Sequence, residues 1–220
     1  MVEPDGLMPT RQFDSVDPAT RVALIEAAAA EFSEHGYEAG SLNRIITEAG
    51  VSKTKFYRWF DDKADLWRTV VRHLVGRFLT RMAMPAAPMV DPASFWGEVR
   101  RQWRLTLAVY AEWPPAAGLV RELARSALVG DGSGALAEAV ATIRASLEVL
   151  IRVGQHVGAV RTDLPFDLVL ALAAGTSDSV DVWLAEHPEV LADPEASDAL
   201  ADDLTDLMRR MATPSTVEAQ

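Results

Sequence analysis

Residues 41–66 read SLNRIITEAGVSKTKFYRWFDDKADL, and the turn signals in this segment predict two short helices joined by a glycine. Ser41 is a suitable N-cap for a helix to about Ala49, and Ser52 is one for a helix to about Phe60. Gly50 lies between them and favours a tight turn. A short helix, a glycine turn and a second short helix form a helix-turn-helix, whose second helix can enter the major groove of DNA.

The second helix of this motif has two chemically different sides. At about 100° per residue, Phe56, Trp59 and Phe60 fall on one side, which should anchor the helix. The opposite arc carries hydroxyls and cations, which suit phosphates and base edges. Its members are Thr54, Lys55, Tyr57 and Arg58, with Lys53 at the helix start. The three lysines of the chain all lie between positions 53 and 63, so positive charge gathers around this helix.

Charge is unevenly distributed along the chain, whose formal net charge is −11. Residues 1–84 hold 11 Lys and Arg against 12 Asp and Glu, whereas residues 85–220 hold 10 against 20. Residues 41–60 hold four cations and one acid. Because salt screens charges beyond roughly 10 Å, a distant acidic half does not abolish the attraction of a local cationic surface for DNA.

Composition excludes several classes of protein. With 220 residues and 49% hydrophobic residues the chain can bury a real core, and it contains no cysteine for disulfides, thiolate catalysis or finger-type zinc sites. No run of about eighteen apolar residues occurs and the N-terminal segment is polar, so we expect no membrane contact, no signal peptide and a cytoplasmic location. Metal-binding spacing is absent among the histidines His35, His73, His156 and His187. We therefore expect no catalytic residue, no metal and no cofactor.

Helix signals run through almost the whole sequence, which predicts an all-α fold of about nine helices. A first helix should begin at Asp17-Pro18 and end at His35-Gly36, with Val22, Ile25, Ala29 and Phe32 on its inner face. Later helices are predicted over Lys63–Met82, Ala93–Ala111, Pro115–Val129, Ala135–Gly154, Pro165–Glu186 and Pro194–Ala212. The predicted domains are a flexible arm (1–17), a three-helix DNA-binding domain (18–63), a C-terminal helical bundle (64–212) and a frayed tail (213–220).

The segment resembles the signature of the TetR family of transcriptional regulators. In that family an Ala-Gly-Val-Ser turn, here residues 49–52, leads into a Tyr-x-x-Phe recognition helix, here Tyr57 to Phe60. A Lys-x-x-Leu pattern follows at the start of the next helix, here Lys63 to Leu66. The resemblance spans residues 18–70, with departures at three positions. Thr54 replaces a common Gly or Ala, Lys55 a common Thr, and Trp59 a frequent His.

This resemblance implies a double-stranded DNA operator as partner. It implies phosphate contacts for Ser41, Ser52, Tyr57 and Lys63, and base or backbone contacts for Arg44, Thr54 and Lys55. Lys53 and Arg58 join the set because they are cations on the same helix. Lys63 opens a helix, where a cation opposes the helix dipole, so its position is easier to understand if an anion lies close by.

The resemblance also implies a pocket for a small-molecule effector, largely apolar or aromatic, in residues 64–212. Trp96, Trp103 and Tyr110 repeat every seven residues, with Leu107 close by, and such a face suits an apolar pocket. A core stripe would produce the same pattern. Arg121 and His156 are the polar candidates for this site.

A homodimer formed through the last two helices is the third implication. Leu200, Leu204, Leu207 and Met211 are spaced 4, 3 and 4, like a coiled-coil seam, although the seam could instead pack inside its own subunit. The preceding helix would add Leu172, Val180 and Trp183. Two recognition helices about one DNA turn apart would read a pseudo-palindrome.

The function we expect is therefore that of a repressor released from its operator when an effector displaces the helix Lys63–Met82. One alternative is a helix-turn-helix adaptor that binds another protein. A less favoured alternative is an all-helical enzyme, with acids such as Asp178, Asp181 and Glu186 as metal ligands.

Overall fold

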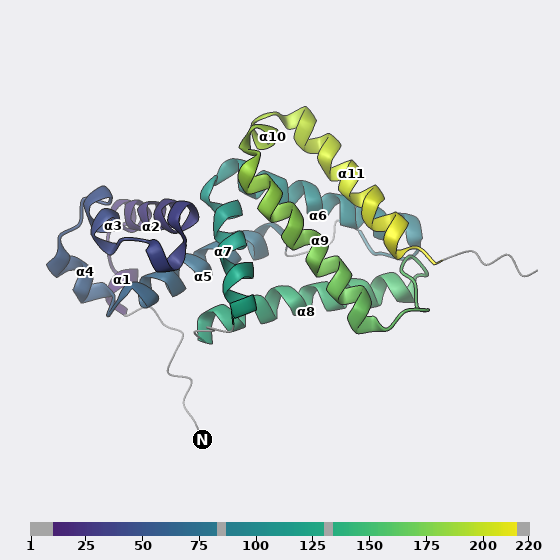
Figure 1. The fold of residues 1–220 in the computed structure, drawn as a ribbon, viewed down its shortest axis with the longest axis horizontal. Coiled ribbons are helices and arrows are strands. Elements are labelled where there is room, and N and C mark those ends of the chain that lie inside the picture. Colours follow the sequence, from purple (N-terminus) through teal and green to yellow (C-terminus); the bar gives the residue numbers. More distant parts are fainter. Residues whose placement is uncertain (1–10, 83–86, 130–133, 215–220) are drawn as a thin grey trace, which may run out of the picture. The chain divides into compact units, whose positions relative to one another are not determined.

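The computed structural model describes residues 11–82, 87–129 and 134–214, and within these ranges the chain is all-helical (Figure 1). The expected all-α fold is confirmed. The described part has eleven helices, because two short ones were not predicted: α1 (Arg11–Asp14) and α10 (Pro188–Ala192). The loop predicted at Gly130–Gly134 and the linker around Pro85 lie largely outside the described residues, as do the ends of the chain.

The chain divides into two compact units, and this division differs from the predicted boundary at residue 63. Unit 1 contains residues 1–77 and 115–141, and unit 2 contains residues 78–114 and 142–220. The helices of unit 1 are α1, α2 (Pro18–Ala39), α3 (Leu42–Glu48), α4 (Lys53–Trp59), most of α5 (Lys63–Met82) and α7 (Pro115–Val129). α7 was expected in the C-terminal bundle, but it packs against α2.

Helix α2 is longer than predicted and contains a break. Asp17 caps its start by accepting the N–H of Thr20 at 3.0 Å, and Pro18 follows as the first helical residue. At Gly36 the backbone turns away from helical geometry (φ 74°, ψ 171°), and three further residues complete the element. Glycine adopts this positive φ without the steric cost that a side chain would bring.

The inner face of α2 is mostly the predicted one. Ile25, Ala29 and Phe32 are buried, whereas Val22 is 57% exposed, so its prediction was wrong. The buried stripe instead runs through Leu24 and Ala28, which lie one turn apart on the same face.

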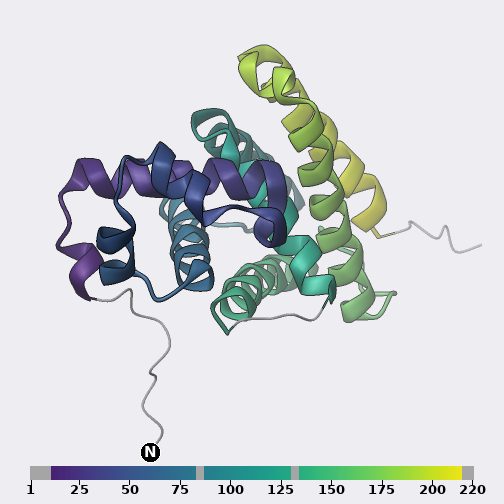
Figure 2. The same ribbon diagram turned by 60° about the vertical axis from the view of Figure 1, so that its left-hand side comes forward.

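The arm before α2 is ordered from Arg11 onward, in contrast to the expectation for residues 11–17. The side chain of Phe13 is buried, and its ring centroid lies 4.7 Å from that of Phe60 and 5.9 Å from that of Trp59. The ribbon of α1 lies beside that of α4 (Figure 2). Apolar burial and ring packing fix α1 to the end of α4.

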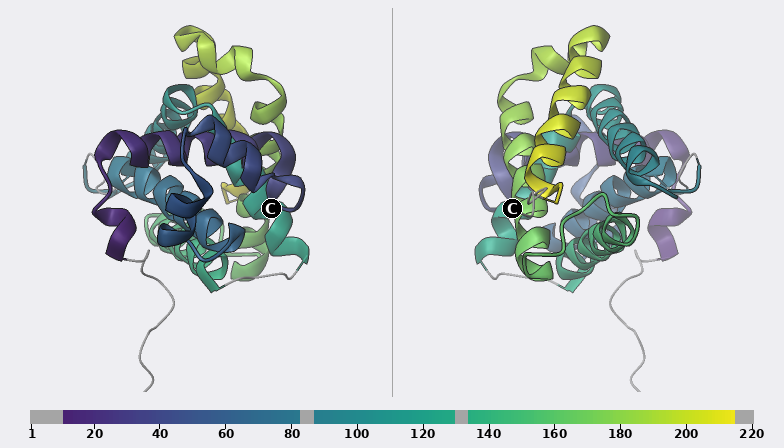
Figure 3. Two further views of the ribbon diagram at one scale, coloured as in Figure 1. Left: turned by 90° about the vertical axis from the view of Figure 1, so that its left-hand side faces the viewer. Right: turned by 90° about the vertical axis from the view of Figure 1, so that its right-hand side faces the viewer.

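Unit 2 is built from α6 (Pro92–Glu112), the greater part of α8 (Gly134–His156), α9 (Phe166–Glu186), α10 and α11 (Pro194–Ala212). α10 reverses the chain after α9, and α11 returns along α6 (Figure 3). Arg100 of α6 pairs with Asp202 of α11 at 3.0 Å, and Arg209 of α11 lies over the ring of Trp96. These contacts hold α11 within its own subunit.

Candidate nucleic-acid interface

The recognition helix α4 is anchored from behind by two phenylalanines. Phe56 and Phe60 are 0% and 1% exposed, and their rings stack with centroids 5.2 Å apart. Phe13 adds a third ring against Phe60. Trp59 is only half-buried at the edge of this cluster. The predicted apolar side of α4 is thus packed into unit 1, which fixes the direction of the opposite side.

The outer side of α4 presents hydroxyls and cations to solvent. Lys53, Thr54, Lys55 and Arg58 are exposed, and the ring of Tyr57 is 58% exposed. Among the described residues, no side chain forms a hydrogen bond or ion pair with the charged groups of Lys53, Lys55 or Arg58. A helix of seven residues therefore carries three exposed cations, of which Lys55 interacts electrostatically with Asp17, the N-cap of α2.

The two serines of the motif are helix caps, as their positions predict. Ser41 Oγ accepts the N–H of Arg44 at 3.4 Å, and Ser52 Oγ accepts the N–H of Lys55 at 3.3 Å. Gly50 makes the turn between the helices with φ 64°. Ser52 is exposed and Ser41 half-buried, so both hydroxyls lie at accessible helix N-termini, where an anion is favoured. A phosphate contact from either serine stays a prediction.

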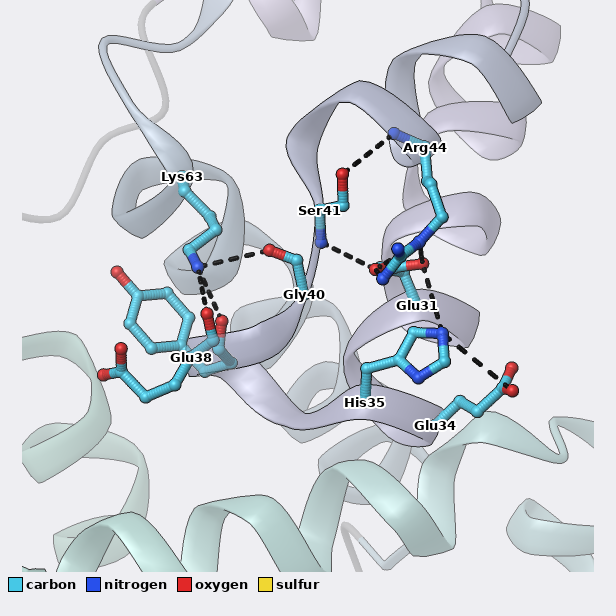
Figure 4. A network of polar contacts seen from close by, with 9 residues as sticks. Glu31, Glu34, His35, Glu38, Gly40, Ser41, Arg44 and Lys63 are labelled. Atoms are coloured by element: carbon cyan, nitrogen blue, oxygen red, sulfur yellow. Dashed lines mark hydrogen bonds and ion pairs between the residues drawn. The ribbon is translucent and has the colours of Figure 1, made fainter.

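Arg44 has a partner within the protein, and the DNA contact that the family resemblance implies for it stays a prediction. Its Nε lies 2.9 Å from Glu31 Oε2 and 3.0 Å from Oε1, so the guanidinium pairs with both oxygens of this carboxylate (Figure 4). The hydrogen bonds from Arg44 hold the pKa of Glu31 below its ordinary value. Glu31 is buried and also accepts the backbone N–H of Ser41 at 2.6 Å. Glu31 therefore fastens the start of α3 to α2.

Lys63 also has a partner within the protein. Its ammonium donates to the carbonyls of Tyr37, Glu38 and Gly40 at 2.8, 3.0 and 3.2 Å, and it lies 4.7 Å from the centre of the Tyr37 ring (Figure 4). Carbonyls at the end of a helix lack helical donors and carry partial negative charge. The end of α2 thus accounts for a cation at the start of α5 without a bound phosphate.

Residues 24–70, which contain this whole arrangement, match the family model described as bacterial regulatory proteins of the tetR family. Over these residues the chain is similar to the regulators of the TetR family. A probable acrEF/envCD operon repressor of Escherichia coli K12 is 27% identical over 175 residues, which cover 75% of this chain and 76% of that protein.

Solved structures of TetR-family regulators share the fold. One from Chloroflexus aurantiacus superposes with a TM-score of 0.67 at 20% identity, covering 93% of this chain and 98% of that one. The regulator FadR of Bacillus subtilis, solved in complex with stearoyl-CoA, gives a TM-score of 0.66 at 18% identity and covers 85% and 96% of the two chains.

Of the residues predicted to bind an effector, five lie in unit 2 and Arg121 lies in unit 1. Trp96, Trp103, Leu107 and Tyr110 are buried side chains of α6 in unit 2, which is the arrangement of a packed core. His156 is exposed at the end of α8. Arg121 lies in unit 1, where its Nη2 donates to the carbonyl of Ser33 at 3.1 Å. Arg121 thus has a backbone partner within unit 1, and its contact with an effector stays a prediction.

A buried polar pair in unit 2 was not predicted. The hydroxyl of Tyr110 on α6 donates to Asp181 Oδ1 on α9 at 2.6 Å, and both side chains are buried. Burial raises the pKa of Asp181 to about 7 and raises the pKa of Tyr110 well above its ordinary value. The two residues are 71 positions apart, so no local pattern could have paired them. Within the described residues, no cluster of three or more His, Asp or Glu is placed to hold a metal ion.

The residues predicted for a dimer interface fall into two groups. Leu204 is buried inside its own subunit, which is the alternative that the sequence left open for this seam. Leu172, Trp183, Leu207 and Met211 are 38–49% exposed, and Val180 and Leu200 are half-buried. By length and composition alone α9 could also cross a membrane, which differs from the sequence expectation. An apolar helix with few buried residues equally fits a surface that another subunit covers.

Proposed function

We propose that this chain is a transcriptional repressor that binds a pseudo-palindromic DNA operator as a homodimer and is released by a small, largely apolar or aromatic effector. The observation that carries the proposal is the outer side of α4. Three exposed cations and two hydroxyl side chains face solvent there, on a helix anchored by buried Phe56 and Phe60. Side chains of this kind at the second helix of a helix-turn-helix suit phosphates and base edges in the major groove.

The charge distribution supports a single approach to DNA. Residues 85–220 carry a surplus of ten acids, which repel a polyanion, whereas the α4 side chains attract it. An adaptor that binds a protein would not need three cationic side chains within a seven-residue helix of an otherwise acidic chain. DNA binding through α4 therefore explains the charge pattern better than the adaptor alternative does.

The exposed apolar side chains of α9 and α11 support a homodimer. Four large ones are Leu172 and Trp183 on α9, and Leu207 and Met211 on α11. A twofold axis through this surface would bring each copy of the surface against the same surface of its partner. The dimer would then carry two α4 helices, as a palindromic operator requires.

Repression and the nature of the effector take their support from the relatives. The relative in Escherichia coli is named an operon repressor, and the FadR structure holds stearoyl-CoA in a fold that this chain shares. An effector with a large apolar part would also suit unit 2, whose α6 contributes a stripe of aromatic and aliphatic side chains. Both assignments are proposals for this chain.

Salt dependence of DNA binding tests the proposed function most directly. Fragments of the source genome that the purified protein retains are selected and footprinted, and their dissociation constants are measured over a range of salt concentrations. Counterion release predicts that the logarithm of affinity falls with the logarithm of salt concentration, by about 0.9 per phosphate contact. A slope near zero would favour the adaptor and overturn the proposal.

The homodimer is tested by replacing its apolar surface with charge. Leu207→Asp combined with Trp183→Asp should convert the chain to a folded monomer in sedimentation experiments, because each charge would have to be buried in the interface. Val90→Asp is a matched control at a 73% exposed valine that precedes α6, and it should leave the mass unchanged. A double variant that sediments like the wild-type chain would place the interface elsewhere.

A further inference from the structure

The break at Gly36 separates two backbone groups that a regular helix would pair. In an α-helix the N–H of residue 37 donates to the carbonyl of residue 33, four positions earlier. Gly36 lies between these two residues and has φ 74° and ψ 171°, which are not helical angles. The end of α2 therefore needs partners from outside the helix for the carbonyl of Ser33 and the N–H of Tyr37.

Two adjacent residues of α7 contact both of these groups. Glu122 Oε1 accepts the N–H of Tyr37 at 3.1 Å, and Arg121 Nη2 donates to the carbonyl of Ser33 at 3.1 Å. The carboxylate of Glu122 is buried, although α7 lies about eighty residues further along the chain. One acceptor and one donor on α7 thus match the donor and acceptor at the break.

Close packing fixes α7 in this position. A Cβ added to Gly118 would lie 2.1 Å from Ser33 Oγ and 3.0 Å from the Ser33 carbonyl oxygen, so α7 approaches α2 more closely than any residue with a side chain would allow. At the break itself, a Cβ on Gly36 would lie 3.1 Å from Glu122 Oε2. We call Gly118, Arg121 and Glu122 the α7 contact.

The turn that the α7 contact holds also supports the DNA-binding helices. We call residues 36–41, from the break in α2 to the N-cap of α3, the turn, and the ammonium of Lys63 binds three of its carbonyls. At its far end the N–H of Ser41 donates to Glu31, and Ser41 then caps α3. α3 leads through Gly50 into α4. The turn is therefore held by α7 at its start, by α5 along its length and by Glu31 at its end.

We propose that Arg121 and Glu122 are positioning residues for DNA binding, because they hold the turn 36–41 in the conformation that places α3 and α4. The proposal rests on the proposed function and deepens it. A displacement of α7 along α2 breaks both hydrogen bonds at once. The turn, and the helices α3 and α4 that follow it, are then no longer held in one position. An effector that moves α7 would thereby weaken operator binding, in addition to any effect it has through α5.

Four variants separate this role from general stability. Glu122→Leu removes the acceptor, whereas Glu122→Gln keeps an oxygen that can accept the N–H of Tyr37. Gly118→Ala leaves both hydrogen-bonding side chains in place but pushes α7 away from Ser33. Glu38→Leu is the matched control, since it removes an exposed acid from the same turn with the same change in charge.

Amide hydrogen exchange and operator affinity are the two readouts, measured at a temperature where every variant is folded by circular dichroism. Glu122→Leu and Gly118→Ala should speed exchange at residues 37–41, and each should weaken operator binding roughly tenfold, which is the loss of one hydrogen bond to a charged group. Glu122→Gln should restore much of the wild-type behaviour. Glu38→Leu should leave exchange unchanged and should not weaken binding.

The outcomes separate this inference from the proposed function. Wild-type exchange and affinity in Glu122→Leu would overturn the inference, and so would faster exchange without loss of affinity. Weaker binding with unchanged exchange would also overturn it, because the effect would then lie outside the turn. Failure of the wild-type chain to bind any genomic fragment would overturn the proposed function itself and remove the basis of this inference.

Discussion

The cations of the helix-turn-helix form two groups, one on the outer side of α4 and one around the turn between α2 and α3. The two groups differ in the partners that the protein gives them. On α4 the charged groups of Lys53, Lys55 and Arg58 face solvent and form no hydrogen bond or ion pair with a described side chain. At the turn, Arg44 pairs with buried Glu31 and Lys63 binds three backbone carbonyls. The first group is accessible to DNA. The second stabilises the turn 36–41 and the start of α3, which position α4 and which we call the frame.

The difference follows from the acceptors that surround each cation. A helix end offers carbonyls without helical donors, and a buried carboxylate needs a cation to offset its desolvation. Lys63 and Arg44 lie next to such groups, so their charges are already paired within the protein. α4 has buried aromatic rings behind it, and its cations face solvent without a hydrogen bond or ion pair to a described side chain. Charge within a motif therefore does not by itself identify a DNA contact.

The largest expected effect comes from removing two side chains of the available group. Lys55→Ala combined with Tyr57→Ala should weaken operator binding roughly a hundredfold or more, since each dimer loses the contacts twice. Both side chains are exposed, so the thermal midpoint and the sedimentation coefficient should not change. Titration of a labelled operator fragment measures the loss. Wild-type affinity in this variant would contradict the assignment of α4 as the reading helix.

A buried acid without a cation extends the comparison to unit 2. Asp181 accepts only a neutral hydroxyl from Tyr110 among its described hydrogen bonds, and burial raises its pKa to about 7. The folded state then holds a proton more tightly than the unfolded chain. The stability that this tighter proton binding contributes is fully present below the ordinary pKa of an aspartate, near 3.8. It is lost as the pH rises through the raised pKa of Asp181, about 7.

Asp181→Asn should therefore remove part of the pH dependence of stability. Between pH 5 and pH 8 the free energy of unfolding of the wild-type chain should fall by a few kcal/mol relative to that of the variant. Urea denaturation at both pH values measures the difference, and asparagine keeps an oxygen for the Tyr110 hydroxyl. Asp203→Asn, an exposed site on α11, is the control. Parallel pH profiles for wild type and Asp181→Asn would show that the acid is not held neutral.

Lys63→Met tests whether the second group of cations serves the frame. The variant keeps the apolar stem but leaves the carbonyls of Tyr37, Glu38 and Gly40 without the ammonium. We expect the free energy of unfolding to fall by about 2 kcal/mol, the range for hydrogen bonds to a charged group. Lys53→Met is the matched control on α4, and it should weaken DNA binding without loss of stability. Equal stability of the two variants would erase the distinction between the groups.

Local signals in the sequence were sufficient for the helix-turn-helix itself. The caps Ser41 and Ser52, the turn at Gly50 and the buried side of α4 depend on neighbours within a few residues, and the structure has them as expected. The same holds for the α5, α7 and α11 bounds, which proline and charge signals marked.

Contacts between distant segments were not predictable in this way. Phe13 was expected in a flexible arm because its partners on α4 are more than forty residues away. The contacts of Arg121 with Ser33 and of Arg44 with Glu31 were not predicted, because these partners lie on a helix that the sequence does not place beside them. The role of a polar side chain depends on which acceptors the fold brings within reach, and periodicity carries no information on that.

The smallest expected effect comes from a double-mutant cycle on Arg44 and Glu31. The cycle tests whether Arg44 belongs with the cations that contact DNA or with those that stabilise the frame. Arg44→Ala leaves the Glu31 carboxylate with the Ser41 N–H but without its cation, and Glu31→Gln weakens both contacts. If Arg44 serves the frame, each single variant should be less stable than the wild-type chain, and the double variant should lose less stability than the sum of the two losses. DNA affinity at matched stability should change little, and its salt slope should stay the same. A slope that falls by about one contact in Arg44→Ala alone would instead move Arg44 into the group that meets DNA, since a guanidinium 57% exposed can exchange a carboxylate for a phosphate.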